Sequence, residues 1–87
     1  MRSKDGAEVV GMKEPEAVAL VLQELQAARL KFGPFNTQHE GYAVILEELD
    51  ELWTEVKKKH RQRDPEATKR EAVQVAAMSL RFLVDLT

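Results

Sequence analysis

One helix-ending signal and one helix-starting signal divide the chain into three segments of helix-forming residues, and they limit the folds open to it. Gly33-Pro34 ends the first segment, because glycine favours a helix C-terminus and proline cannot continue the backbone hydrogen bonds. Asp64-Pro65 starts the last segment, with aspartate in the capping position and proline in the first turn. The segments show no alternating strand pattern, so the sequence predicts an all-α protein.

We expect helices over residues 14–31, 40–59 and 66–86, joined by short connections. Residues 1–13 contain two glycines and mixed charge without a sustained period, so they are predicted to form a flexible arm. The rest of the chain, 14–87, is then a single domain, since 87 residues leave no room for a second.

The start of the middle helix carries a recognisable cap. Thr37 and Glu40 have the spacing of a capping box, in which the threonine hydroxyl accepts from the third helical amide and the glutamate reaches back. Gly41 follows, at a cost of about 1 kcal/mol of helix propensity against alanine. We interpret this glycine as a point where another part of the chain approaches the backbone closely.

Apolar residues recur through the middle helix at the i, i+3, i+4, i+7 spacing that predicts one buried stripe. That stripe comprises Tyr42, Ile45, Leu46, Leu49, Leu52, Trp53 and Val56. Beside it, Glu48 and Glu51 are one helical turn apart, so their carboxylates lie on one face and repel each other. A hard cation would turn that repulsion into attraction.

The last helix lacks a polar face. One apolar stripe includes Val73, Ala77 and Leu80, and a second, on nearly the opposite side, includes Met78 and Phe82. A helix that is apolar all round is buried on both sides, and three helices cannot surround it within one chain. We therefore predict an antiparallel helical bundle of about three main helices, completed by oligomerisation as a homodimer or a homotetramer.

Glu71 and Gln74 lie one turn apart between those two stripes, where a carboxylate and an amide need partners. If the middle and last helices are antiparallel neighbours, this pair converges with Glu48 and Glu51. Three carboxylates and an amide oxygen suit Mg²⁺, or Mn²⁺ in its place, rather than zinc. Such a site can activate water and hold a phosphoryl oxygen.

The net charge and the absence of cysteine exclude several classes of partner and site. The net charge of −2 indicates no bulk affinity for nucleic acid or for a membrane. The absence of cysteine excludes disulfides and zinc–thiolate sites. We see no secretory segment and no apolar run near about 18 residues, so a cytoplasmic location is expected.

The motif EELDE at residues 47–51, followed by EAVQ at 71–74, resembles the hallmark of the MazG-like all-α nucleoside triphosphate pyrophosphohydrolases. That hallmark is EExxE on one helix and ExxD on the next. The stretch GPFNTQHEGYAVILEELDELWTEV, residues 33–56, also looks like a small single-domain branch carried by phages and mobile elements. The resemblance covers roughly residues 19–86.

The resemblance implies an Mg²⁺-dependent hydrolase that cleaves a nucleoside or deoxynucleoside triphosphate to the monophosphate and pyrophosphate. It implies that Glu48, Glu51 and Glu71 are metal ligands and that Glu47 binds a second metal or positions the water, so that all four are catalytic. Gln74 stands where the family has aspartate; its amide oxygen can be a ligand but brings no charge and cannot act as a base. Either Glu47 or a neighbouring acid compensates, or the chain is an inactive or altered nucleotide-binding module. A purely structural helical partner is the third alternative.

Further polar residues are candidates for binding the substrate. Cations for the phosphate oxygens are Lys57, Lys58, Lys59, Arg61, Arg63, Lys69 and Arg70. Trp53 can stack on a base, and Asn36 and His39 can contact a base or sugar. The plainer interpretations are a cationic end that complements the helix dipole, a tryptophan in the core or an interface, and an exposed histidine.

Overall fold

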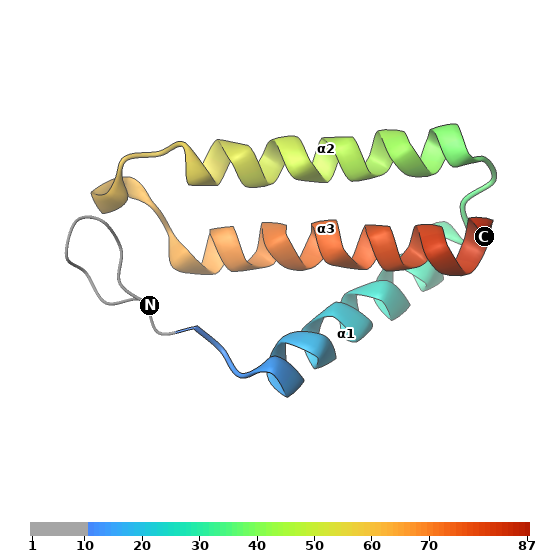
Figure 1. The fold of residues 1–87 in the computed structure, drawn as a ribbon, viewed down its shortest axis with the longest axis horizontal. Coiled ribbons are helices and arrows are strands. Elements are labelled where there is room, and N and C mark those ends of the chain that lie inside the picture. Colours follow the sequence, from blue (N-terminus) through green and yellow to red (C-terminus); the bar gives the residue numbers. More distant parts are fainter. Residues whose placement is uncertain (1–10) are drawn as a thin grey trace.

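The structure, a computed structural model, describes residues 11–87. These fold into α1 (Glu14–Phe32), α2 (Gln38–Val56), a 3-10 turn η1 (His60–Gln62) and α3 (Pro65–Leu86), as Figure 1 shows. Within the described residues there is no β-strand, and the prediction of an all-α protein with three main helices is confirmed. Of the expected arm, 1–10 lie outside the described residues, and 11–13 precede α1 without regular secondary structure.

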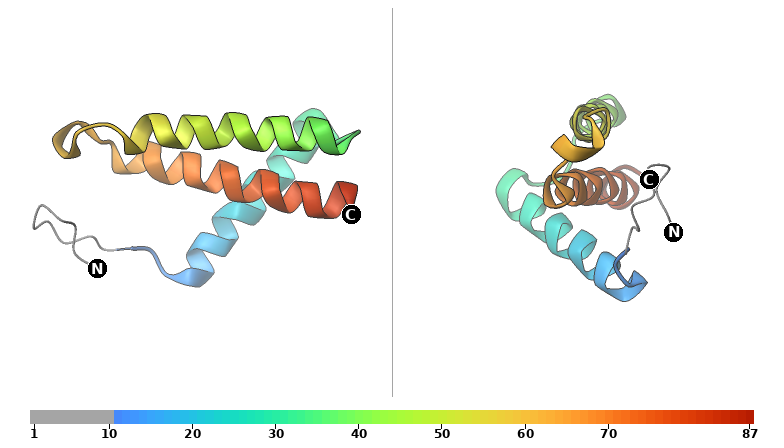
Figure 2. Two further views of the ribbon diagram at one scale, coloured as in Figure 1. Left: turned by 45° about the horizontal axis from the view of Figure 1, so that its top comes forward. Right: turned by 90° about the vertical axis from the view of Figure 1, so that its left-hand side faces the viewer.

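The helix α3 lies between the other two. It runs back alongside α2, whereas α1 crosses its other side obliquely (Figures 1 and 2). Ala77 and Met78 of α3 are therefore buried within one chain, together with Ala28 of α1 and Phe35 of the following loop. We expected that covering both sides of α3 requires a second subunit. For Ala77 and Met78 this expectation is wrong, because α1 and α2 of the same chain cover them.

The expected single buried stripe of α2 is also wrong in part. Ile45 packs against the core, and Gly41 is the buried residue of this helix. Leu52 is half-buried, and the five other residues of the stripe are exposed by 38–65%. We call these five the α2 flank: Tyr42, Leu46, Leu49, Trp53 and Val56. These follow a 4-3-4-3 spacing, which at about 100° per residue places them roughly a quarter turn away from Gly41 and Ile45. The apolar arc of α2 is wider than its contact with α3.

The caps of the helices form largely as the sequence predicts. Thr37 Oγ1 accepts a hydrogen bond from the Glu40 amide at 3.0 Å. The Glu40 carboxylate reaches back to the amide of Asn36, at 2.7 Å, one residue further than in a standard capping box. Asp64 caps α3 by accepting from the Glu66 amide at 3.0 Å.

The close approach expected at Gly41 is present. A Cβ atom placed on this residue would lie 2.6 Å from Cδ2 of Phe82 and 3.0 Å from Cδ1 of Leu86. The absence of a side chain at Gly41 therefore lets the start of α2 pack directly on the end of α3.

A buried ion network anchors the loop between α1 and α2. Arg81 is 5% exposed, stacks 3.9 Å from the centroid of the Phe35 ring and donates to the carbonyl of Gly33 at 2.6 Å. Asp85, one turn on, accepts from the Phe35 amide at 2.9 Å and from Arg29 at 3.2 Å. These contacts join α3 to the loop from which α2 begins, and so fix where α2 lies relative to α3.

Candidate metal centre

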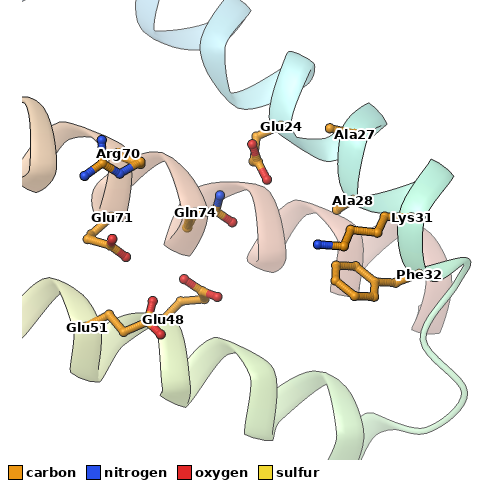
Figure 3. A pocket seen from close by; sticks show the side chains of 10 residues that line it. All are labelled: Glu24, Ala27, Ala28, Lys31, Phe32, Glu48, Glu51, Arg70, Glu71 and Gln74. Atoms are coloured by element: carbon orange, nitrogen blue, oxygen red, sulfur yellow. The ribbon is translucent and has the colours of Figure 1, made fainter.

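Three carboxylates from two helices meet in the middle of the α2–α3 contact. One oxygen from each of Glu48, Glu51 and Glu71 lies within 4.8 Å of the other two. Figure 3 shows Glu48 and Glu51 projecting from α2 toward Glu71 of α3. The spacing within α2 puts two acids on one face, and the pairing of α2 with α3 supplies the third.

The environment of these acids disfavours their charged forms. Burial, followed by the nearby Glu51 carboxylate, raises the pKa of Glu48 from 4.5 to about 7. Burial also raises the pKa of Glu71, again with Glu51 adding to the effect, while Arg70 opposes it. Without a cation, the fold therefore holds three carboxylates close together at an electrostatic cost.

One oxygen of the cluster has no donor. Within residues 11–87, Glu71 Oε2 is buried and forms no hydrogen bond. A buried acceptor without a partner costs about 1–3 kcal/mol, so such atoms need an explanation. A divalent cation fits this donor set, because Mg²⁺ and Mn²⁺ prefer carboxylate oxygens and bring the positive charge that the cluster lacks.

The carboxylates open into a cavity of about 290 Å³ between the three helices, shown in Figure 3 and here called the acidic cavity. α3 adds Arg70 and the half-buried Gln74 to its wall. α1 closes the other side with one face, formed by Glu24, Ala27, Ala28 and Lys31, and with Phe32.

A second cavity of about 420 Å³ adjoins the first and is here called the apolar cavity. Phe35, Val44 and Met78 are among its apolar walls, and Asn36 is among its polar residues. Both cavities share Glu24, Ala28, Phe32, Glu48 and Gln74, so they meet at the acids. A ligand that spans both cavities would therefore pass beside the Glu48 carboxylate.

The structure gathers some of the sequence-predicted residues and separates others. Gln74 and Arg70 line the acidic cavity, and Glu47 and Asn36 line the apolar one. The remaining candidates for substrate binding line neither cavity: His39, Trp53, Lys57, Lys58, Lys59, Arg61, Arg63 and Lys69.

Two of those cations already have partners. Lys58 pairs with Glu55 at 3.0 Å, and Lys69 pairs with Glu66 at 3.5 Å. The basic run that starts at Lys57 follows the C-terminus of α2. Lys57 is the C-cap residue, and the last turn of α2 itself contains no basic residue.

Sequence reasoning missed the face that α1 turns toward the carboxylates. Glu24, Ala27, Ala28 and Lys31 follow the i, i+3, i+4, i+7 spacing of one helix face. On that face two charged residues lie two turns apart with only alanines between them, a pattern that was available in the sequence.

Comparisons of the chain with protein-family models, with curated proteins and with solved structures find no match. No helix within residues 11–87 is both long enough and apolar enough to cross a membrane. The three clustered carboxylates are therefore the feature of the described residues that bears most directly on function.

Proposed function

We propose that the protein is a MazG-like, Mg²⁺-dependent nucleotide pyrophosphohydrolase. It would cleave a nucleoside or deoxynucleoside triphosphate to the monophosphate and pyrophosphate. The observation that carries the proposal is the convergence of Glu48, Glu51 and Glu71 within 4.8 Å, with a buried Glu71 oxygen left without a donor. Three clustered carboxylates make a poor structural element and a good cation site.

In this proposal Glu48, Glu51 and Glu71 hold Mg²⁺, and Gln74 lies at the edge of the same cavity. The bound ion would neutralise phosphate charge and lower the pKa of a water molecule. Arg70 and Lys31, on opposite walls of the acidic cavity, attract the phosphate oxygens. The adjoining apolar cavity receives the nucleoside, with Asn36 available to bond its edge.

We further propose that an antiparallel bundle is completed by a second copy of the chain. The α2 flank is a row of exposed apolar residues, and large exposed apolar patches mark interaction sites. On α3 the exposed Ala72, Ala76, Ser79 and Leu83 follow a matching 4-3-4 spacing. A homodimer, or a homotetramer built from two dimers, would cover both rows.

The test of the proposed activity is release of pyrophosphate from a panel of NTPs and dNTPs with Mg²⁺ or Mn²⁺. Glu48→Ala and Glu71→Ala are expected to abolish turnover, because each removes a ligand of the ion. Asp50→Asn is the matched control, since it removes one exposed carboxylate from α2 outside the cluster. If no nucleotide is turned over, the proposal that the protein is a pyrophosphohydrolase is refuted.

Gln74 favours one alternative, a module that binds a nucleotide and a metal without chemistry. If Gln74→Asp creates turnover in an otherwise inactive protein, the natural chain is such a module. Calorimetric titration with Mn²⁺, with and without nucleotide, separates this from a purely structural role, in which no heat of binding would appear.

A further inference from the structure

We propose that Glu24 of α1 takes the proton from the attacking water in this centre, a role that the neutral amide of Gln74 cannot fill. This inference rests on the proposed function and adds to it a residue from a helix that carries neither acidic motif. Hydrolysis needs a proton acceptor beside the metal-bound phosphate. Glu48, Glu51 and Glu71 are committed to the ion, and an amide has no capacity to accept that proton.

The position of Glu24 fits this role. It lines the acidic cavity from α1, whereas the metal ligands come from α2 and α3. Figure 3 shows its carboxylate extending from α1 toward the space in front of Gln74, on the far side from Glu48 and Glu51. It does not belong to the group of three oxygens within 4.8 Å, so it is available to a water rather than to the ion.

The surroundings of Glu24 leave its carboxylate available for this role. The residue is half-buried, and within residues 11–87 no hydrogen bond or ion pair of its side chain is found. The next residues on its helix face are Ala27 and Ala28, which have no bulk to fill the cavity. Glu24 also lines the apolar cavity, so it lies where the nucleoside and the phosphates of one substrate would join.

The step balances as a simple hydrolysis. The water oxygen forms a bond to the phosphorus, and the bond from that phosphorus to the bridging oxygen breaks. The bridging oxygen leaves with the electron pair as part of pyrophosphate. The proton of the water passes to the Glu24 carboxylate and from there to solvent.

The experiment compares Glu24→Gln, Glu24→Asp and the double variant Glu24→Gln/Gln74→Asp with the natural chain. Glu24→Gln is expected to lower kcat by about 10²–10⁴-fold, the usual contribution of a positioned base. KM and the calorimetric affinity for Mn²⁺ are expected to stay within about twofold, because the metal ligands are intact. Glu24→Asp should keep part of the activity, and the double variant should regain it, because Gln74→Asp returns a carboxylate to the same cavity.

Glu16→Gln is the control, since Glu16 is an exposed acid in the first turn of α1. Two results would overturn the inference while leaving the proposed function in place. One is a kcat of Glu24→Gln equal to that of the natural chain. The other is a loss of Mn²⁺ affinity as large as that of Glu48→Gln, which would make Glu24 a ligand instead. If the natural chain turns over no nucleotide, the proposed function fails and this inference fails with it.

Discussion

Replacing Glu48 with glutamine should raise the free energy of unfolding of the metal-free protein and lower that of the metal-bound protein. The carboxyl has its pKa raised from 4.5 to about 7, so the fold disfavours its charged form. At about 1.36 kcal/mol per pKa unit the penalty is about 3 kcal/mol, and solvent screening of this partly exposed group leaves about 1–2 kcal/mol. At pH 8 in EDTA, Glu48→Gln removes that penalty.

In saturating magnesium the natural protein should instead be more stable than Glu48→Gln. A ligand at about 100 times its Kd stabilises the natural protein by about 2.7 kcal/mol, and a variant that has lost one of three carboxylates gains much less. For a domain of this size each kcal/mol moves Tm by about 4–8 °C. Thermal unfolding followed by circular dichroism, in EDTA and in saturating MgCl₂, measures all four states.

Asp50→Asn serves as the control, because it removes one exposed charge from the same helix and should change neither the EDTA value nor the magnesium shift by much. The reasoning fails if Glu48→Gln is less stable than the natural chain in EDTA. It fails equally if magnesium raises Tm by the same amount in both, since Glu48 would then contribute nothing to a cation site.

Three further predictions concern pH, packing and assembly. In EDTA the natural chain should gain stability as pH falls from above about 7 toward 4.5, since a carboxyl with a raised folded pKa is penalised only while charged; urea titrations of Glu48→Gln should show a flatter profile. Gly41→Ala should cost about 1–3 kcal/mol in urea unfolding, despite the better helix propensity of alanine, because its Cβ would lie 2.6 Å from Phe82; unchanged stability would mean that Phe82 moves aside freely. Leu49→Glu, on the exposed α2 flank, should shift the mass measured by light scattering to that of a monomer, and a protein already monomeric at high concentration would contradict the proposed assembly.

The local signals in the sequence were sufficient for the helices and for the three acids. Proline, glycine and capping residues act within a few positions, so they locate helix ends without knowledge of the fold. Glu48 and Glu51 share a face by spacing alone, and the short connection before Asp64 brings α3 back beside α2. Glu71 was then expected near them, as the structure has it.

The contacts between distant residues could not be predicted in the same way. The spacing of the α2 flank shows that its residues share one face, but not that α3 covers the neighbouring face instead. Glu24 was missed because the pattern that it forms with Ala27, Ala28 and Lys31 marks a face of α1 but does not say that this face meets the acids. Arg81 and Phe35 are far apart in the sequence, and the residues around each of them do not predict that the two side chains stack.

The anchor formed by Arg81 and Asp85 has a consequence for the order of folding. Its partners, Arg29, Gly33 and Phe35, precede it by 48 to 56 residues. During synthesis, which proceeds from the N-terminus, the connection from α1 to α2 stays unfastened until residue 85 has left the ribosome. Helices can form early, but α1 and α2 acquire their final positions around that connection only late, so a ribosome-bound intermediate of this chain would be helical and yet lack the assembled acidic cavity.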